Sequence, residues 1–367
     1  MSLQCGIVGL PNVGKSTLFS ALVHRQVLTD TYPFTTIEPN IGVIPVPDDR
    51  LDRLAEFLQP EKVIPTTLRV VDIAGLIKGS HHGEGLGNQF LGQIREVDAL
   101  IHLVRCFNSK QVTHITPDLD PIGDIEIVET ELILKDLATV SNRLEKATQK
   151  AKSGDREAGK ETEFLNSLAA HLNRGTPARE IPLDSWGATL LKELFLITTK
   201  PVLYVGNESE EAATAHQLSA AARSLLQWGQ ENEQEVIILS ATLEHELAFL
   251  ENNEERQFFM AEWGLEKVGL EVLIKSSYRL LNLITFFTTE SNHVQAWTVQ
   301  KGATAPEAAG QIHTDFARGF IRADVYHYED LINLASEVKL REKGKIRSEG
   351  RDYLVQDGDI IQIKFNV

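Results

Sequence analysis

Residues 9–17 constrain the fold of this chain more than any other part of its sequence. They read GLPNVGKST, which matches the pattern GxxxxGK[ST]. The apolar run 4–10 before the loop has the composition of a buried strand, and residues 15–24 after it have helical composition. In a strand, glycine-bearing loop and helix in this order, backbone N–H groups and the helix N-terminus point at an anion. The sequence therefore predicts the phosphate-binding loop (P-loop) of a nucleotide-binding domain.

The loop residues have separate expected roles. Glycines let backbone N–H groups wrap the β-phosphate. Lys15 bridges the β- and γ-phosphates, which makes it a catalytic candidate, and Ser16 offers its hydroxyl to Mg²⁺. The predicted nucleotide-binding residues here are Asn12, Val13, Gly14, Lys15, Ser16 and Thr17.

A second motif follows the apolar run 68–71, which ends in Asp72-Ile73-Ala74-Gly75. This DxxG places a carboxylate and a glycine amide at the tip of the next strand. Asp72 would hold the metal through water, and the Gly75 amide would sense the γ-phosphate. Between the two motifs, Thr36 is preferred over Thr35 as a further metal ligand, although either could be a simple turn residue. The predicted metal ligands are Ser16, Thr36 and Asp72, and Gly75 joins the catalytic set.

The base-reading position departs from the GTPase pattern Asn-Lys-x-Asp, because residues 207–210 read Asn-Glu-Ser-Glu. In GTPases the aspartate accepts two hydrogen bonds from guanine. A buried carboxylate facing adenine, whose N1 is an acceptor, would be penalised, so we expect Glu210 to point elsewhere. Asn207 and backbone groups would then read the base. The residues that this motif predicts for the base site are Asn207, Glu208 and Glu210; Ser240 and Ala241 join them only as what the family resemblance described below implies.

Further apolar runs at 67–73, 99–107, 202–206 and 235–239 alternate with helical stretches. Such alternation is typical of a mostly parallel sheet wound by helices, so the predicted fold class is α/β.

The stretch between the runs at 99 and 202 is too long for one crossover, and it becomes charged and helical from about Asp124. Apolar residues spaced four and three apart predict a coiled-coil seam, followed by a break and a shorter return seam. Two antiparallel helices would then project as an arm, and an ordinary helical hairpin packed on the sheet is the alternative. The seam residues are Ile133, Leu137, Val140, Leu144, Ala147 and Ala151, with Leu165, Leu168 and Leu172 returning.

From about Leu283 the chain becomes rich in β-branched and aromatic residues, which predicts a small α+β domain. Residues 306–316 are expected to be helical. Segments 353–355 and 360–365 are expected to form a hairpin that turns at Asp357-Gly358. The predicted division is a nucleotide-binding domain of residues 1–123 and 201–282, a helical coiled-coil insertion of 124–200, and a C-terminal domain of 283–367.

The charge of the chain limits its partners. Its 367 residues include 36 basic and 52 acidic side chains, a net charge of −16 that repels nucleic acid. We therefore expect no DNA partner and only local contacts with RNA. Six basic residues near the C-terminus form a candidate patch, of which a solvated charged loop is the alternative interpretation. They are Lys339, Arg341, Lys343, Lys345, Arg347 and Arg351.

The two cysteines and the lack of a long apolar run predict the cellular compartment of the protein. Cys5 and Cys106 lie far apart within apolar runs, which fits buried, reduced thiols. The N-terminal residues lack a signal-peptide pattern, and no apolar run approaches roughly 18 residues. We expect a cytoplasmic protein without a membrane partner, and nothing in the sequence demands a dimer.

The order GLPNVGKST, YPFTTIEPN, DIAGLIKG, NESE and SAT, with a helical arm and a β-rich C-terminal module, resembles the YchF/Obg-like ATPase family. This family is a branch of the Obg group of translation-factor-class P-loop proteins. The segments AWTVQKGATAPEAAGQIHTDF and GRDYLVQDGDIIQIKFNV resemble its TGS domain, a β-grasp module. The resemblance runs through essentially the whole chain.

The resemblance implies an ATPase that prefers ATP over GTP, uses Mg²⁺ and hydrolyses slowly. Leu76 stands where Ras-like enzymes carry a glutamine that orients the attacking water, and its side chain cannot hydrogen-bond to water. The family is thought to use a loop histidine instead, and His114 occupies that position. From the residues alone, His114 could equally be a solvated loop residue. Asn12 corresponds to a P-loop asparagine that coordinates K⁺ in some related proteins.

The resemblance also implies association with ribosomes, through the large subunit and its rRNA, in translation or stress regulation. Two alternatives stay open at this point. The chain could be a ribosome-binding module whose nucleotide is structural, or a GTPase in ribosome assembly, against which the NESE sequence argues.

Overall fold

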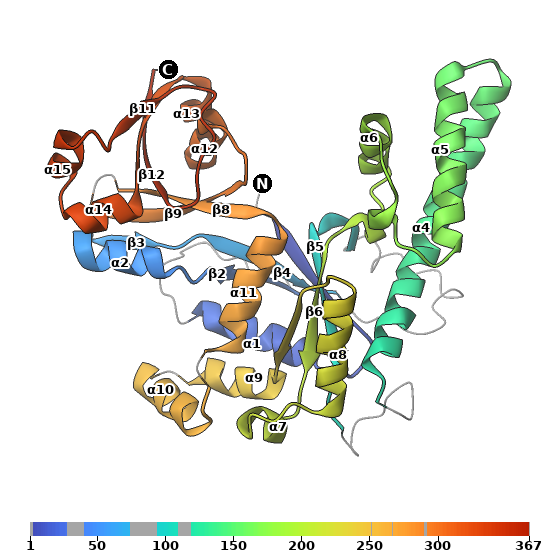
Figure 1. Cartoon of the computed structure of the whole chain (residues 1–367), viewed down its shortest axis with the longest axis horizontal. Coiled ribbons are helices and arrows are strands. Elements are labelled where there is room, and N and C mark those ends of the chain that lie inside the picture. Colours follow the sequence, from blue (N-terminus) through green and yellow to red (C-terminus); the bar gives the residue numbers. More distant parts are fainter. Residues whose placement is uncertain are drawn as a thin grey trace.

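The computed structural model describes residues 3–27, 40–73, 94–108, 119–250, 252–265, 267–289 and 292–366. Two six-stranded sheets form the body of the chain, and a pair of long helices projects away from them (Figure 1). The longest described helices do not have the length and apolar character needed to cross a membrane.

The first sheet has the predicted α/β architecture. Its strand order is β2-β4-β1-β5-β6-β7, and every neighbouring pair is parallel except β2 and β4. Every residue of β5 is buried, which explains its continuous apolar character. The strands are β1 (Gln4–Val8), β2 (Ile41–Pro45), β4 (Thr67–Asp72), β5 (Ala99–Arg105), β6 (Val202–Asn207) and β7 (Val236–Leu239).

Helices pack around this sheet and begin directly after several of its strands. The helix after the P-loop is α1 (Lys15–Val27), and α7 (Glu210–Thr214) and α9 (Ala241–Phe249) follow β6 and β7. Their N-termini therefore gather at the carboxyl ends of the strands, where ligands bind in open α/β sheets. The remaining helices of this region are α8 (Ala220–Glu231), α10 (Asn253–Glu262) and α11 (Gly269–Leu280).

The predicted arm is confirmed as α4 (Pro121–Lys152) and α5 (Arg156–Asn173), two helices that project from the body (Figure 1). Asp120 accepts a hydrogen bond from Gly123 N–H at the start of α4, and Asp155 caps α5 in the same way. The predicted seam forms the core of the arm, while the lower part of α4 packs on the first sheet. Buried seam residues are Ile133, Val140, Ala147, Leu165, Leu168 and Leu172, and Leu137 and Leu144 are partly buried.

The base of the arm is tied to β6 by one buried carboxylate. Asp136 of α4 accepts hydrogen bonds from the N–H groups of Ile197 (2.8 Å) and Thr198 (2.7 Å) and from the Thr198 hydroxyl (2.6 Å). These residues form η3 (Ile197–Thr199), shortly before β6 begins. Burial raises the pKa of Asp136, and the bonds from Thr198 and Ile197 oppose that rise. The short elements η2 (Ala178–Glu180) and α6 (Ser185–Glu193) complete the insertion.

The second sheet has the order β11-β10-β12-β8-β9-β3 and contains both parallel and antiparallel pairs. Its strands are β3 (Lys62–Ile64), β8 (Leu283–Thr288), β9 (His293–Gln300), β10 (Phe320–His327), β11 (Arg347–Glu349) and β12 (Asp359–Phe365). Its helices are α12 (Ala305–Ile312), α13 (Thr314–Arg318), α14 (Tyr328–Leu334) and α15 (Glu337–Glu342). The single helix predicted over 306–316 is interrupted at His313, whose backbone is extended.

The hairpin predicted over 353–355 and 360–365 is wrong. β12 pairs antiparallel with β10 and parallel with β8, whereas Leu354 makes only an isolated bridge with Thr304. The loop is shaped by Asp359, whose carboxylate accepts from Tyr353 Oη (2.7 Å) and Gln356 N (2.9 Å). Polar anchoring of the loop therefore takes the place of strand pairing.

The second sheet also receives a segment from the N-terminal part of the chain. Helix α2 (Asp49–Leu58) packs Leu51 and Leu54 in the same apolar cluster as Phe287, and β3 pairs in parallel with β9. This segment lies between β2 and β4, within the predicted nucleotide-binding domain. The stretch from β2 to β4 therefore contributes strands to both sheets (Figure 1). The division of the chain into three domains by residue range stays a prediction.

Candidate nucleotide-binding site

The P-loop has a backbone that only particular residues can adopt. Gly9 has φ +149°, and a Cβ atom there would lie 2.4 Å from the carbonyl oxygen of Leu103 on β5. Lys15 folds back over the loop, and its Nζ donates to the carbonyl oxygens of Gly9 (3.0 Å) and Leu10 (2.7 Å). The loop therefore already holds the ammonium group beside the place where phosphates bind.

Burial lowers the pKa of Lys15, and the nearby carboxylate of Asp72 opposes this shift. Asp72 ends β4, next to β1, so the sheet brings the two sequence motifs together. Burial raises the pKa of Asp72, while Lys15 and a hydrogen bond with the Ser16 side chain lower it. Lysine and carboxylate thus stabilise each other's charged form.

Ser16 and Asp72 bring two oxygen donors together, as the prediction of a metal site requires. Hard oxygen ligands suit Mg²⁺, which usually takes one or two protein ligands and completes its shell with waters and substrate phosphates. Within the described ranges, groups of three or more His, Cys, Asp and Glu residues that could hold a metal do not occur. The residues present therefore fit a Mg²⁺ ion that arrives with a nucleotide. The predicted ligand Thr36 lies outside the described residues.

Asn207 joins the P-loop to the turn after β7. Its Nδ2 donates to the carbonyl oxygen of Val13 (2.8 Å), and its Oδ1 accepts from the N–H of Ala241 (2.9 Å). Gly14 fits against it, because a Cβ atom there would lie 2.4 Å from Asn207 Nδ2. Sequence reasoning assigned Asn207 to base reading and missed this bridge, since only the fold brings residues 13, 207 and 241 together.

Glu208 turns its carboxylate into the protein. It is 3% exposed, and it accepts hydrogen bonds from the N–H groups of Ser209 (2.9 Å) and Ser219 (3.0 Å). Ser219 caps α8, so Glu208 fixes the loop after β6 to that helix. Glu210, in contrast, is exposed in the first turn of α7. That it points away from the base stays a prediction.

Ser240 and Ala241 are buried at the start of α9, beside Asn207, and Ala241 lies close to Gly14 of the P-loop. The Ser240 hydroxyl has no hydrogen-bond partner among the described groups. A buried hydroxyl without a partner is costly. That this turn lies beside the base stays a prediction.

Asn12 is exposed at the rim of the P-loop with φ 61°, and Thr17 is half-buried in the first turn of α1. The predicted residues Thr36, Gly75 and His114, together with Leu76, lie outside the described residues. Their roles stay predictions.

His102 is a residue that sequence reasoning missed. It lies in the middle of β5, is 4% exposed and contacts the Tyr204 ring at a centroid distance of 5.6 Å. Burial, together with the positive charges of Lys15 and Arg179, lowers its pKa to about 3. The sequence signal available was a histidine within an otherwise apolar strand, and such a histidine is more often a core residue than a site residue.

Comparison with known proteins places the chain in a family. It is 46% identical to the ribosome-binding ATPase YchF of Bacillus subtilis (strain 168), over 367 residues that cover 100% of both chains. It is 44% identical to the protein of the same name from Escherichia coli O157:H7, again over the full length of both. The chain belongs to the YchF family.

Structure and domain comparisons agree with membership of the YchF family. The solved structure of the Schizosaccharomyces pombe YchF GTPase superposes with a TM-score of 0.88 and 35% identity, over 99% of this chain and 98% of that one. Residues 4–143 match the model of the 50S ribosome-binding GTPase family. Residues 283–366 match the YchF-GTPase C-terminal family, described as a protein of unknown function.

Proposed function

We propose that this chain is a Mg²⁺-dependent ATPase that binds ATP in preference to GTP and acts as a nucleotide-controlled switch on the ribosome. The proposal extends to this chain the activity and partner by which its B. subtilis and E. coli relatives are named. The S. pombe relative is called a GTPase, so the preference for ATP over GTP is the part of the proposal that most needs a test.

The observation that carries the ATP preference is the position of the two carboxylates after β6. A guanine site needs a carboxylate that faces the base and a lysine stem that covers it. Here Glu208 is engaged with Ser209 and Ser219, and Glu210 is exposed on α7. Backbone groups beside Asn207 are then the polar groups left to meet the base, and they place no negative charge against adenine N1.

Lys15, Ser16 and Asp72 supply the phosphate and metal chemistry in this proposal. Lys15 would leave the carbonyl oxygens of Gly9 and Leu10 to bind β- and γ-phosphate oxygens. Ser16 and Asp72, with Thr36, would hold Mg²⁺, which neutralises charge on the transferred phosphoryl group. Gly75 would sense the γ-phosphate and His114 would orient water, because Leu76 cannot. We therefore expect slow hydrolysis. The proposal also includes a K⁺ ion coordinated by Asn12.

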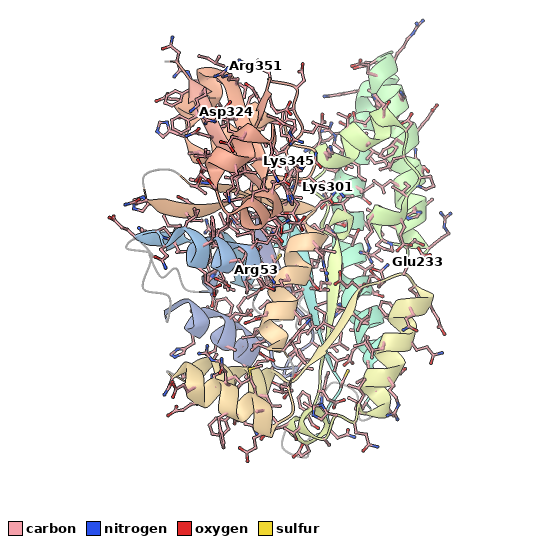
Figure 2. All side chains as sticks on the ribbon, turned by 60° about the vertical axis from the view of Figure 1, so that its left-hand side comes forward. Arg53, Glu233, Lys301, Asp324, Lys345 and Arg351 are labelled. Carbon is pink, nitrogen blue, oxygen red and sulfur yellow. The ribbon has the colours of Figure 1, made fainter. Side chains whose placement is uncertain are left out.

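The proposed partner is the large ribosomal subunit, contacted through rRNA phosphates. Six exposed basic residues of the C-terminal domain, defined here as the basic patch, support this contact; Figure 2 shows Lys345 and Arg351 on that domain. Lys345 pairs with Asp330 (3.1 Å) and Arg347 with Glu349 (3.3 Å), so part of the patch is internally neutralised. Phosphate contacts by the others would position RNA without reading its sequence. The basic patch is Lys339, Arg341, Lys343, Lys345, Arg347 and Arg351.

The experiment measures ATP turnover and ribosome co-sedimentation of the full chain, which we expect to act as a monomer in the cytoplasm. A switch predicts that ribosomes stimulate turnover and that Lys15→Ala abolishes the stimulation. If ribosomes leave turnover unchanged while nucleotide-dependent binding is retained, the result would favour a ribosome-binding module with a structural nucleotide.

The double variant Lys339→Glu, Lys343→Glu tests the basic patch. It should weaken co-sedimentation with ribosomes and make that binding less dependent on salt. Unchanged binding would move the contact elsewhere, and the helical arm is the next candidate.

A further inference from the structure

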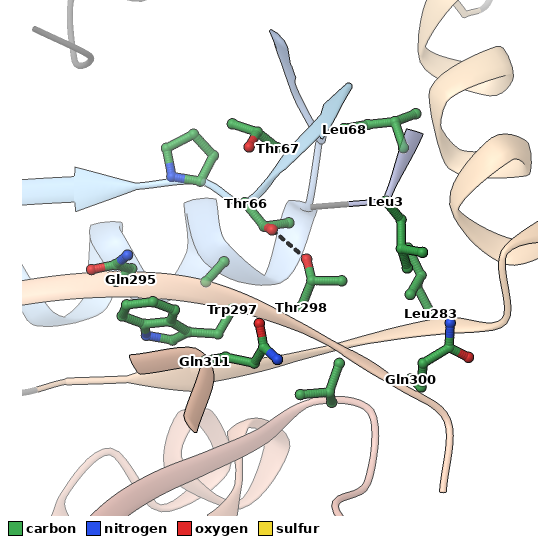
Figure 3. Close-up of a pocket in the computed structure, with 13 residues that line it drawn as sticks. Leu3, Thr66, Thr67, Leu68, Leu283, Gln295, Trp297, Thr298, Gln300 and Gln311 are labelled. Carbon is green, nitrogen blue, oxygen red and sulfur yellow. Dashed lines mark hydrogen bonds between the residues drawn. The ribbon is translucent and has the colours of Figure 1, made fainter. Parts of the chain in front are cut away.

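Thr298 of β9 is the point where two segments that pack with the first sheet reach the second sheet. Its hydroxyl accepts a hydrogen bond from Tyr278 Oη of α11 (3.0 Å). It forms another hydrogen bond with the hydroxyl of Thr66, the residue directly before β4 (Figure 3). Helix α11 and strand β4 each lead back towards the candidate nucleotide-binding site. Thr298 therefore lies at the end of two paths from that site.

The first path runs from the turn after β7 along α11. Glu244, in the first turn of α9, is 4% exposed and accepts hydrogen bonds from the N–H groups of Gly269 (2.6 Å) and Leu270 (3.1 Å). A Cβ atom at residue 269 would lie 2.5 Å from Glu244 Oε1, so a side chain there would displace the carboxylate. Ala241, which begins α9, donates to Asn207. The start of α11 is thus fixed to the turn predicted to lie beside the base, and α11 runs from there to β8 (Figure 1).

Tyr278 joins the other end of α11 to the second sheet. It is 8% exposed, and besides donating to Thr298 its hydroxyl lies 3.1 Å from the carbonyl oxygen of Ile284 and 3.0 Å from the hydroxyl of Thr285. Burial raises the pKa of Tyr278 to about 12, so the phenol keeps its proton at neutral pH. Helix α11 is therefore attached to two neighbouring strands, β8 and β9.

The second path runs along β4 from the metal motif. Asp72 ends this strand, and Thr66 lies directly before its first residue. β4 pairs with β1 on one side and with β2 on the other, and the N–H of Val46 donates to the carbonyl oxygen of Thr66 (2.9 Å). A strand that is paired on both sides moves as one body with its sheet. A displacement of Asp72 would therefore reach Thr66.

A cavity of about 290 Å³ lies beside the contact between Thr66 and Thr298 (Figure 3). It separates residues 295–300 of β9 from residues 65–68 at the start of β4. Because no described side chain fills this space, the two sheets can shift relative to each other here without repacking a close-packed core. The contact at Thr298 can thus exist in two states, the closed one of this structure and an open one.

We propose that the Thr298 hydroxyl couples the nucleotide-binding site to the second sheet, through Tyr278 for the base turn and through Thr66 for the metal motif. A Mg²⁺–nucleotide that binds the closed state more tightly would stabilise β9 at a distance. The inference rests on the proposed nucleotide-controlled switch and names the residue through which it acts. Thr298 is a positioning residue, since it lies at the opposite end of β4 from Asp72.

Hydrogen exchange of the full-length chain tests the coupling without ribosomes. Saturating Mg²⁺ and a non-hydrolysable ATP analogue should slow exchange of the backbone N–H groups of β9 about tenfold, because the closed contact holds that strand. Thr298→Val keeps the shape of the side chain but removes the hydroxyl, and it should reduce the slowing to less than about twofold. Thr298→Ser keeps the hydroxyl and should restore it. Undiminished slowing in Thr298→Val would overturn the proposal.

Thr288→Val is the matched control. Thr288 of β8 is half-buried like Thr298, and its hydroxyl accepts a hydrogen bond from Trp297 Nε1 (3.0 Å) within the second sheet. This control variant should keep the full slowing of β9. Equal loss in the two valine variants would show a general loosening of the second sheet and would overturn the role of Thr298.

Two further variants each interrupt one path. Tyr278→Phe removes the contact from α11, and Thr66→Val removes the contact from β4. Each should leave a slowing of about threefold, between those of the unmodified chain and Thr298→Val. Full slowing in both variants would show that neither path carries the effect and would overturn the proposal.

Ribosome-stimulated ATP turnover separates a failure of this inference from a failure of the proposed function. Thr298→Val should lose the stimulation, while its turnover at saturating ATP without ribosomes stays within about twofold of the unmodified chain. Stimulation that persists in Thr298→Val would overturn this inference and leave the proposed function standing. If ribosomes do not stimulate the unmodified chain, the proposed switch itself fails, and this inference fails with it.

Discussion

The two sheets of this chain differ in how far their local sequence determines them. In the first sheet β1 and β5 are almost wholly buried, and such strands appear as continuous apolar runs. In the second sheet β10 mixes buried and exposed positions, and β3 comes from more than 200 residues away in the sequence. Local pattern therefore predicts strands that are covered on both faces, whereas partners at a sheet edge depend on tertiary contacts.

The same difference separates the nucleotide-binding site from the cavity that Trp297 lines between the two sheets. Lys15, Asp72 and Asn207 follow or end strands of the first sheet, so their meeting at one edge could be predicted from motifs. The cavity beside Trp297 combines residues from β9, α12 and the start of β4. No motif marks it, because its residues meet only where the second sheet lies against the start of β4.

The largest expected effect is confined to the first sheet. Lys15→Ala should weaken ATP binding about 100-fold, because it removes charge-assisted hydrogen bonds to two phosphates. The matched variant Lys275→Ala removes an exposed lysine that pairs with Asp49 at the junction of the sheets. Titration calorimetry should show little change for that control. Equal losses in both variants would contradict the separation of the two regions.

Arg50→Ala should lower stability and leave ATP binding almost unchanged, because Arg50 holds the second sheet to its N-terminal segment. Its guanidinium donates to Asp48 and to Asp357, and it lies over the rings of Phe287 and Tyr328. Burial opposes the charge, but hydrogen bonds and proximity to Asp48 and Asp357 raise the pKa of Arg50 on balance.

We expect Arg50→Ala to lower the free energy of unfolding by about 2 kcal/mol, a moderate value because Asp357 is half exposed. Urea denaturation measures this change. Arg50→Lys keeps the charge but loses the two-pronged contact, so its loss should be smaller. The ATP dissociation constant should stay within about twofold in both variants; a large rise would mean that the second sheet controls the P-loop.

Acid should weaken the first sheet through His102. Its pKa is about 3 in the folded chain, against 6.5 for an unperturbed histidine, so the unfolded state binds an extra proton below about pH 6.5. Stability is therefore lost as the pH falls from 6.5 towards 3. Between pH 7 and pH 5 this histidine should cost about 2 kcal/mol of unfolding free energy. Urea denaturation of His102→Gln should show a shallower pH dependence by that amount, and an unchanged slope would contradict the assignment.

The smallest expected signal concerns the thiols of the first sheet. Cys5 and Cys106 are fully buried, and burial raises the pKa of each to about 12. Since the thiolate is the reactive form, neither should react with a disulfide reagent at pH 8 in the folded chain, and both should react in urea. Rapid labelling of the folded chain would show that β1 or the end of β5 opens.

Two features of the nucleotide site could not be predicted from the sequence, and both depend on side-chain direction. The motif places Glu208 where GTPases carry a lysine, but it does not show that Ser219 lies close enough to hold the carboxylate inward. The role of Asn207 as a bridge likewise needs the P-loop and the turn at Ala241 to be adjacent in space. In the C-terminal domain, Asp357-Gly358 has the composition of a hairpin turn, yet Arg50 and Thr285 bind Asp357 from other segments.

The central claim is that the site beside Asn207 and Glu208 takes adenine. The most direct test is titration calorimetry of the nucleotide-free chain with Mg²⁺–ATP and Mg²⁺–GTP under the same conditions. We predict an ATP dissociation constant at least about tenfold lower than that for GTP, because the carboxylate of Glu208, directly after Asn207, is turned inward to Ser209 and Ser219. A lower dissociation constant for GTP would contradict the account of the base site and place the chain functionally among the GTPases.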